Sequence, residues 1–331
     1  MKTIRWGILG CGKIARKFAS DLKWVTHAEL VAVGAREQST ANEFASNFPV
    51  KYKHTNYQSL AENPEVDVIY IATPHAFHHE HTLLCLKNKK AVLCEKAFAI
   101  NLRQAKEMIE VAQKENVFLM EAFWTKFLPH YQKMKMMIAE KKIGNIQNIA
   151  ANFGFIPTEP IAPRIYDPKL GGGSLLDIGV YPVFLALDLL GSPDEIEAVM
   201  TTSGQGTDSQ CAMQLKYHNG ALAQLFSTFN SNLSTGADIA GDCGRIRLTH
   251  RFHGPTTILE YYPGIIDTRE IIPFEAAKGN GYEYEAQHVT DCLANGLTQS
   301  PIVKFSDTLL LMETLDRIRQ KAGLRYPADD H

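Results

Sequence analysis

Short apolar runs alternate with helix-like patterns through the first 120 residues of the chain. The runs that are apolar enough to form buried strands are residues 4–9, 30–33, 66–72, 91–94 and 117–120. The stretches between them in which apolar residues recur every three or four positions are residues 13–24, 40–48, the segment around 83–86 and the segment after Asn101. Asn101 followed by Gln104 is a variant of the helix capping box. Strands that alternate with helices in this way predict parallel βαβ units in a doubly wound sheet.

The pattern changes after about residue 145. Residues 210–217 alternate between polar and apolar side chains, Asn219-Gly220 supplies a turn, and residues 222–229 return, which is a strong hairpin signal. Further strands are expected at residues 245–248, 257–262 and 269–272, and final helices at residues 284–294 and 306–321. The chain therefore predicts an α/β domain over residues 1–122 and an α+β domain with a mostly antiparallel sheet over residues 123–331.

The composition excludes several classes of protein. The 331 residues carry 34 Lys and Arg against 36 Asp and Glu, so the net charge of -2 argues against a nucleic-acid-binding protein. No apolar run approaches the roughly 20 residues that span a bilayer, and the run at residues 6–9 is too short for a signal-peptide core. Six scattered cysteines without a C-x-x-C pair are expected to be free thiols. We therefore expect a cytoplasmic protein without membrane or nucleic-acid partners.

Residues Gly10-Cys11-Gly12-Lys13-Ile14-Ala15 match the pattern G-x-G-x-x-G/A between a predicted strand and a predicted helix. In that context the glycines allow a tight turn and close approach of a pyrophosphate, which the helix N-terminus stabilises. A purely structural glycine turn is the alternative, and a methyltransferase would use a similar turn.

The end of the second predicted strand concerns the choice of cofactor. An NAD enzyme usually places Asp or Glu there to bind the ribose 2′-hydroxyl, but this strand ends in Val33-Gly34-Ala35-Arg36. Because arginine suits a 2′-phosphate, we prefer NADP over NAD, although NAD remains possible. The alternative is that Arg36 is a solvated loop residue.

Two further strand ends carry polar residues. Thr73-Pro74 follows the third apolar run and Glu95-Lys96 follows the fourth, at the edge of the sheet where ligands bind in doubly wound folds. A lysine at that edge can polarise a carbonyl or lower the pKa of a hydroxyl.

A histidine cluster at the start of the third helix consists of His75, His78, His79 and His81. A metal site here is disfavoured, because Glu80 is the sole nearby acidic partner and the cluster follows a cofactor-side strand. We expect His75 to line the cofactor crevice, and we predict no metal.

The segment Gly171-Gly172-Gly173 precedes a helix that places Asp177 and Tyr181 one turn apart. Three glycines indicate close approach of a ligand, and an acid and a phenol on one face can both point into a cleft. The alternative is a helix-capping aspartate and a tyrosine half in the core.

These pieces together resemble the glucose–fructose oxidoreductase / inositol dehydrogenase (Gfo/Idh/MocA) family over nearly the whole chain. The segments that carry the resemblance are Gly10 to Ala15, Ala72 to His75, Cys94 to Lys96 and Asp177 to Tyr181. Residues 121–129 and 170–182 look most like the branch of dimeric dihydrodiol dehydrogenases and sugar reductases. A tyrosine at position 181, where the inositol branch has histidine, also favours that branch.

The resemblance implies an N-terminal Rossmann domain and a C-terminal domain whose open sheet pairs two subunits into a homodimer. It implies that Tyr181 moves a proton at the substrate oxygen, that Lys96 assists it, and that Asp177 orients the substrate. The residues that we expect at the cofactor are Gly10, Cys11, Gly12, Lys13, Ile14, Arg36, Thr73, Pro74, His75, His78, Glu95, Lys96 and Trp124. The residues that we expect at the substrate are Lys96, Trp124, Phe155, Arg164, Asp177, Tyr181 and Tyr282.

One position departs from the family pattern. The family usually has Glu-Lys-Pro, often with a cis bond, where this chain has Glu95-Lys96-Ala97. The sequence leaves open whether the bond before Ala97 is cis or trans.

The sequence therefore predicts an NADP-dependent oxidoreductase that acts on a small polyhydroxylated or carbonyl substrate: a sugar, a keto-sugar or a trans-dihydrodiol. A non-catalytic sensor that binds a nicotinamide cofactor on the same fold is the alternative.

Overall fold

The computed structural model describes residues 2–264 and 268–330, and the chain divides into two compact units. Unit 1 consists of Met1–Lys126 and Ala277–Leu309, and unit 2 consists of Phe127–Ala276 and Leu310–His331. The predicted division between residues 122 and 123 did not foresee that residues 277–309 return to the first unit. They do so because the carboxylate of Asp21 accepts hydrogen bonds from the backbone N–H groups of Asn280 and Tyr282, at 2.8 and 3.0 Å.

Unit 1 contains a sheet of six parallel strands in the order β3-β2-β1-β4-β5-β6. Its strands are β1 (Ile4–Leu9), β2 (Ala28–Gly34), β3 (Tyr52–His54), β4 (Val68–Ile71), β5 (Ala91–Glu95) and β6 (Leu119–Ala122). The predicted doubly wound parallel sheet is confirmed, and β4 and β5 are buried at every position, as expected for strands covered on both faces. The sequence did not predict the short edge strand β3.

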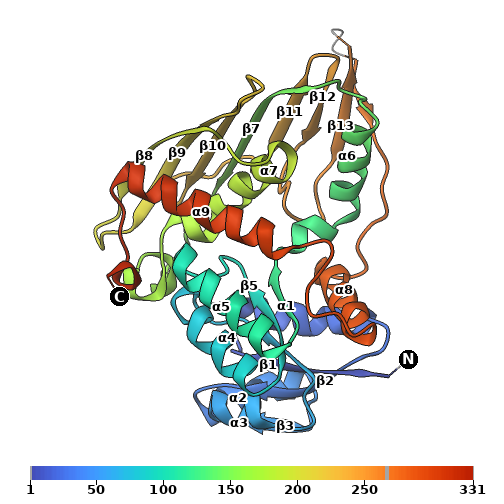
Figure 1. The fold of residues 1–331 in the computed structure, drawn as a ribbon, viewed down its shortest axis with the longest axis vertical. Coiled ribbons are helices and arrows are strands. Elements are labelled where there is room, and N and C mark those ends of the chain that lie inside the picture. The colour runs from blue at the N-terminus through green and yellow to red at the C-terminus, as the bar shows by residue number, and fades with distance from the viewer. Residues whose placement is uncertain (1, 265–267, 331) are drawn as a thin grey trace. The chain divides into compact units, whose positions relative to one another are not determined.

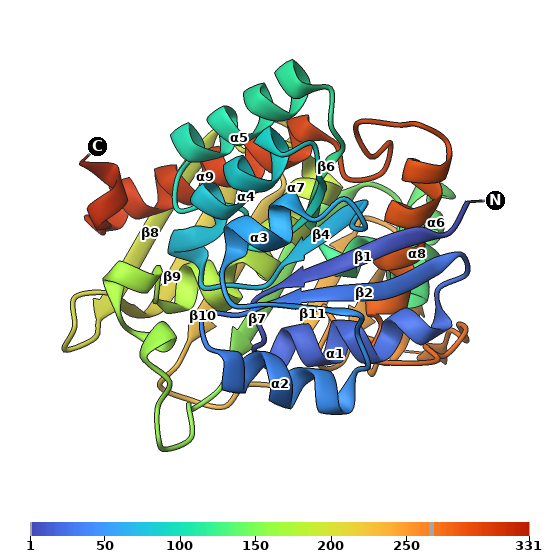
Figure 2. The same cartoon turned by 90° about the horizontal axis from the view of Figure 1, so that it is seen from below.

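Helices cover both faces of this sheet, with α1 and α2 on one side and α3, α4 and α5 on the other (Figure 2). The helices of unit 1 are α1 (Lys13–Asp21), α2 (Gln38–Asn47), α3 (Tyr57–Glu62), α4 (His78–Lys87), α5 (Leu102–Glu115) and α8 (Tyr282–Ala294). Asn101 caps α5 as predicted, because its side-chain oxygen accepts the N–H of Gln104 at 3.0 Å. The stacked rings of Phe18 and Tyr70, 3.8 Å apart, join α1 to β4 inside the core.

Unit 2 is built on an eight-stranded sheet in the order β14-β13-β12-β11-β7-β10-β9-β8, whose strands fan out side by side in Figure 1. The strands are β7 (Ile146–Gly154), β8 (Glu195–Thr202), β9 (Asp208–Lys216), β10 (Leu222–Thr228), β11 (Ala237–Gly241), β12 (Gly244–Leu248), β13 (Leu259–Pro263) and β14 (Glu270–Ile271). Each neighbouring pair is antiparallel except β7 and β10. The predicted hairpin is β9 and β10, joined through Asn219-Gly220.

The helices of unit 2 are α6 (Pro129–Ala139), α7 (Val180–Leu190) and most of α9 (Phe305–Ala322). A single turn of π-helix (Leu175–Gly179) leads into α7. The short 3₁₀ turns of the chain lie at Leu22–Trp24, His75–Phe77, Trp124–Phe127, Pro163–Ile165, Pro168–Leu170 and Pro327–Asp329.

Residues 168–190 form the one segment of the described chain that is long and apolar enough to cross a membrane by length and composition. In the structure 83% of its most apolar 18-residue window is buried inside the protein, and residues with positive φ at Gly171 and Gly173 interrupt the segment. It consists of a 3₁₀ turn, the glycine turn, the π-helical turn and α7.

All six cysteines are free thiols, as expected.

Candidate active site

The glycine turn after β1 requires glycine at position 10 for two reasons. Gly10 has φ +98°, which side chains rarely adopt, and a Cβ there would lie 2.9 Å from the carbonyl oxygen of Ala72. The turn is therefore closed against the loop that follows β4.

Gly12 is different, since no described residue requires a glycine there. Its φ is -70°, and no atom of the described residues lies within 4 Å of the position that a Cβ would occupy. Gly12 is also the N-cap of α1 and has no side chain to cap the free N–H groups of the first turn, which begins with Lys13 and Ile14. A glycine that leaves room beside a bare helix N-terminus fits a pyrophosphate, which needs close backbone approach and N–H donors. The residues of this turn therefore fit a dinucleotide.

Arg36 is an exposed residue between β2 and α2. Its charge acts on two neighbours, Tyr57 and His81. Burial, and then the charges of His78 and Arg36, lower the pKa of His81 to about 4. The imidazole of His81 also contacts the hydroxyl of Thr73 at 3.0 Å. The end of β2 thus carries a solvent-accessible cation beside an aromatic ring and a histidine.

His78 lies in the interior rather than on a surface. Its Nδ1 is 2.8 Å from the carbonyl oxygen of Ala97, and its Nε2 is 2.8 Å from that of Thr73. Burial lowers the pKa of His78 to about 4. The ring therefore ties the loop after β4 to the loop after β5. Among the described residues no group of three or more His, Cys, Asp or Glu is arranged to hold a metal ion.

Lys96 follows the last residue of β5, and the peptide bond between Lys96 and Ala97 is cis. The neighbouring Glu95 is nearly buried and accepts hydrogen bonds from the hydroxyl of Tyr70 and from the N–H of Lys96. The side chain of Lys96 is partly exposed. The structure therefore holds the glutamate of this pair in the interior and leaves its lysine accessible.

Glu121 of β6 was not singled out as a site residue from the sequence. It is 3% exposed, and its Oε2 accepts a hydrogen bond from the hydroxyl of Thr308 at 2.8 Å. Burial raises the pKa of Glu121 from 4.5 to about 7, while the bonds to Thr308 and Phe98 and the charge of Lys96 oppose that rise. The sequence indicated this residue only weakly, since Glu121 is an acidic residue near the end of an apolar strand. That strand is the neighbour of the strand that precedes Lys96.

Trp124 and Tyr282 come together although they are far apart in the sequence. Their rings stack with centroids 4.5 Å apart and an interplanar angle of 6°. Both side chains belong to unit 1, and both are mostly buried. Two residues expected at the substrate therefore form one aromatic pair.

In unit 2 the predicted residues around α7 form a second group. The guanidinium Nη1 of Arg164 lies 3.2 Å from each carboxylate oxygen of Asp177. Asp177 is 9% exposed and sits in the π-helical turn, a feature often found at functional sites. Half of the Arg164 side chain remains exposed. The pair presents donors and an acceptor at a partly open surface.

Tyr181 lies in the first turn of α7 and packs against two rings that the sequence analysis missed. The centroid of its ring is 4.5 Å from that of His253 and 5.8 Å from that of Phe153. Phe153 in turn contacts His253 at 4.4 Å and Phe155 at 6.3 Å. The sequence could have indicated Phe153, because it lies two residues before Phe155 in the same apolar segment. It gave no indication of His253, which lies in a loop far from Tyr181 along the chain.

The interpretation of the three glycines before this helix changes. A Cβ at Gly172 would lie 2.8 Å from the carbonyl carbon of Tyr166, and one at Gly173 would lie 2.3 Å from Oδ1 of Asp208. These glycines are required by packing inside unit 2, so they do not by themselves indicate a ligand.

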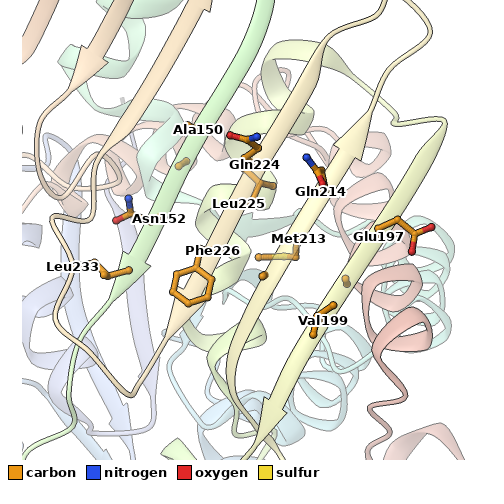
Figure 3. A pocket seen from close by; sticks show the side chains of 13 residues that line it. Ala150, Asn152, Glu197, Val199, Met213, Gln214, Gln224, Leu225, Phe226 and Leu233 are labelled. Carbon is orange, nitrogen blue, oxygen red and sulfur yellow. The ribbon is translucent and has the colours of Figure 1, made fainter.

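A hollow of about 560 Å³ lies elsewhere in unit 2, over strands β7 to β10 (Figure 3). Ala150 and Asn152 line it, while Phe153 contacts Tyr181. Because alternate residues of a strand point to opposite faces, the hollow lies on the face of the sheet away from Tyr181.

Two family models match this chain. The model described as "Oxidoreductase family, NAD-binding Rossmann fold" matches residues 4–123, and the model of the GFO/IDH/MocA C-terminal domain matches residues 131–247.

The chain is also similar to named proteins over its full length. It is 37% identical to the trans-1,2-dihydrobenzene-1,2-diol dehydrogenase of Xenopus tropicalis, over 98% of this chain and 99% of that protein. The mouse protein of the same name is 34% identical with the same coverage. Among solved structures, KijD10, a 3-ketoreductase from Actinomadura kijaniata in complex with NADP and TDP-benzene, is 26% identical with a TM-score of 0.88 and covers 97% of this chain and 98% of that one. The aldose-aldose oxidoreductase of Caulobacter crescentus shares the fold, with a TM-score of 0.89, 22% identity and the same coverage.

Proposed function

This chain belongs to the Gfo/Idh/MocA family of NAD(P)-dependent oxidoreductases, and we propose that it transfers hydride between NADP and a small polyhydroxylated or carbonyl substrate. The substrate class that we propose is a sugar, a keto-sugar or a trans-dihydrodiol, since the named relatives are dihydrodiol dehydrogenases and a structural neighbour is a 3-ketoreductase. The observation that carries the proposal is that unit 1 contains both an open glycine turn at Gly12 and an accessible lysine, Lys96.

We propose that the cofactor pyrophosphate binds at the turn from Gly10 to Ile14. When bound, NADP supplies or takes up hydride at nicotinamide C4. Arg36 supports a 2′-phosphate because its guanidinium is exposed and planar and can donate two hydrogen bonds to one phosphate. A structural neighbour that contains NADP is consistent with this preference. The interior position of His78 favours a role in holding the loops of Thr73 and Ala97 rather than direct cofactor contact.

Tyr181 is the proposed general acid and base at the substrate oxygen. A tyrosine has an ordinary pKa of about 10, so its ionised form must be stabilised for work near neutral pH. The proposed role of Lys96 is to provide that stabilisation as a cation. The rings of His253 and Phe153 hold the tyrosine ring in one orientation.

Asp177 and Arg164 are proposed to orient the substrate. A carboxylate accepts hydrogen bonds from hydroxyl groups, and a guanidinium donates them, so the pair can recognise neighbouring oxygens of one substrate. Trp124, Tyr282 and Phe155 are proposed as apolar walls. We also propose a cytoplasmic homodimer that pairs through the open sheet of unit 2.

Replacement of Tyr181 tests the catalytic assignment. We expect Tyr181→Phe to lower kcat by about 10²–10⁴-fold, because the hydroxyl that moves the proton is removed while the ring stays. The measurement at 340 nm is NADPH consumption with keto-sugars and diketones, and NADPH formation from NADP+ with diols, together with a fluorescence titration of NADPH. Tyr261→Phe is the matched control, because it removes a phenol that donates a hydrogen bond to the backbone oxygen of Lys142, away from the residues of the proposed site. Unchanged kcat in Tyr181→Phe refutes the assignment.

The cofactor proposal has its own test. We expect Arg36→Ser to weaken NADPH binding by about tenfold to a hundredfold and to leave NADH binding unchanged, since a hydrogen bond to a charged group is lost. Fluorescence titration with both nucleotides measures this, and Arg325→Ser in unit 2 controls for the loss of one positive charge. A parent protein that binds NADH more tightly than NADPH overturns the preference. Failure to bind either nucleotide would mean that the glycine turn has been misread.

A further inference from the structure

The helix that carries Asp177 and Tyr181 begins at a turn that is held from several sides. The side chain of Asp208 on β9 accepts hydrogen bonds from the hydroxyl of Ser174, at 2.6 Å, and from the N–H of Leu175, at 2.7 Å. Asp208 is fully buried, and a carboxylate at this point satisfies donors at the helix N-terminus. The start of the helix is therefore anchored to the sheet by a side chain.

A second anchor comes from the C-terminal end of the chain. The hydroxyl of Tyr326 donates a hydrogen bond of 2.6 Å to the carbonyl oxygen of Gly172. Tyr326 is 2% exposed, and its hydroxyl lies 3.0 Å from the position that a Cβ would take at Gly173. The tyrosine thus closes the glycine turn immediately before the helix.

Tyr326 is itself fixed by a buried arginine. The guanidinium of Arg319 lies 5.2 Å from the centre of the Tyr326 ring and forms ion pairs with Asp316, at 2.5 Å, and Asp329, at 2.6 Å. The carboxylate of Asp329 also accepts the N–H of Tyr326 at 2.8 Å. Because Arg319 is only 4% exposed, this network is shielded from solvent and holds the tyrosine rigidly.

We propose that Tyr326 is a positioning residue for catalysis, which acts through the turn of Gly172 and Gly173 on the orientation of Asp177 and Tyr181. The proposal rests on the proposed function of those two residues. A small shift of a catalytic group costs rate far more than it costs stability, since reacting atoms must meet within a narrow range of distances. Tyr326 would then support catalysis from the interior, through its hydrogen bond to the backbone of Gly172.

The test removes one hydroxyl and keeps the ring. We expect Tyr326→Phe to lower kcat by about tenfold to a hundredfold, with the KM for substrate changed less than threefold and the Kd for NADPH unchanged. The deuterium isotope effect on kcat with NADPH labelled at C4 should rise, because a displaced Tyr181 makes the chemical step slower. Tyr261→Phe is the matched control, since it also removes a phenol-to-carbonyl bond within unit 2.

A purely structural role would lower the melting temperature and the yield but leave the kcat of the folded fraction and the isotope effect unchanged. That result, or an equal loss of kcat in Tyr261→Phe, overturns the proposal. If Tyr326→Phe does not fold, Asp329→Asn removes the charge that holds the same tyrosine through its N–H and should give the same kinetic pattern.

Tyr181→Phe measured in parallel separates the positioning role of Tyr326 from the proposed function of the site. Full kcat in Tyr181→Phe overturns the proposed function, whereas loss of kcat there with a normal Tyr326→Phe overturns only the positioning role.

Discussion

Single buried side chains in unit 1 determine the electrostatics around Lys96. Glu95 accepts a hydrogen bond from the hydroxyl of Tyr70, and Glu121 in the neighbouring strand is buried. Removal from water raises the pKa of Glu121 to about 7, although the charge of Lys96 lowers it. A carboxyl that holds its proton near neutral pH leaves Lys96 with less counter-charge, which suits the role that we propose for Lys96 in stabilising a phenolate.

The pH dependence of stability follows from that raised pKa. Between pH 4.5 and 7 the folded protein holds a proton on Glu121 that the unfolded chain has released, so the free energy of unfolding falls as pH rises through this window. We expect Glu121→Gln to gain up to about 3 kcal/mol relative to the parent between pH 5 and pH 8. Urea unfolding followed by tryptophan fluorescence measures this, because all three tryptophans lie in unit 1. Glu110→Gln, an exposed helix position, is the control, and an equal pH response in both variants contradicts the prediction.

At the scale of elements, the segment from Gly171 to Leu190 shows how local geometry serves a site. The glycines pack against the backbone near Tyr166 and against Asp208, the π-helical turn carries Asp177, and α7 carries Tyr181. The wide π turn changes the regular four-residue spacing that the sequence predicted on one α-helical face. Because a Cβ at Gly172 or Gly173 would overlap neighbouring atoms, the turn can pack this closely against the backbone near Tyr166 and against Asp208 only with glycine at these positions.

Glycine replacements test that reasoning. We expect Gly173→Ala to lower the free energy of unfolding by on the order of 3 kcal/mol, from an unfavourable φ of +117° and an overlap with Asp208. Gly220→Ala is the matched control, since it has φ +86° but nothing within 4 Å of a Cβ, and should cost about 1–2 kcal/mol. Urea unfolding of both variants measures whether packing against Asp208 adds to the cost of the positive φ. Equal losses would show that backbone conformation alone, rather than packing, requires glycine at position 173.

At the scale of the whole molecule, the face of the unit 2 sheet away from Tyr181 carries an open hollow with exposed apolar side chains. Val199 is 73% exposed there and lines the hollow together with Phe226 (Figure 3). Exposed apolar surface of this kind marks an interaction site, and a sheet face can pair with a second copy of itself about a two-fold axis.

A charge on that face should prevent the proposed dimer. We expect the parent to have the mass of a dimer in light scattering and Val199→Lys to have the mass of a monomer, because each copy would have to bury an unpaired charge in the proposed interface. Leu297→Lys, which places the same charge on an exposed leucine of unit 1, should remain a dimer. A monomeric parent, or a dimeric Val199→Lys, contradicts pairing through this face.

The sequence by itself determined the strands of unit 1 other than β3, its longer helices, the Asn219-Gly220 hairpin, the cap at Asn101 and the family, because these depend on residues that are neighbours in the chain. Apolar runs, turn residues and glycine spacing are local signals, and burial against helices on both faces reinforces them. The sequence did not predict the helices α3 and α6 or the strands β3, β7, β8 and β11. The strands among them are short or of mixed polar composition, so their place in a sheet depends on their neighbours rather than on their own residues.

Only the tertiary structure decided which distant side chains meet. It paired Trp124 with Tyr282, placed His253 on Tyr181, enclosed His78 and Glu121, and brought Tyr326 to the glycine turn. It also returned residues 277–309 to unit 1 through Asp21. The physical reason is that burial and hydrogen bonding between remote segments depend on how the chain packs. No periodicity along the chain records those contacts.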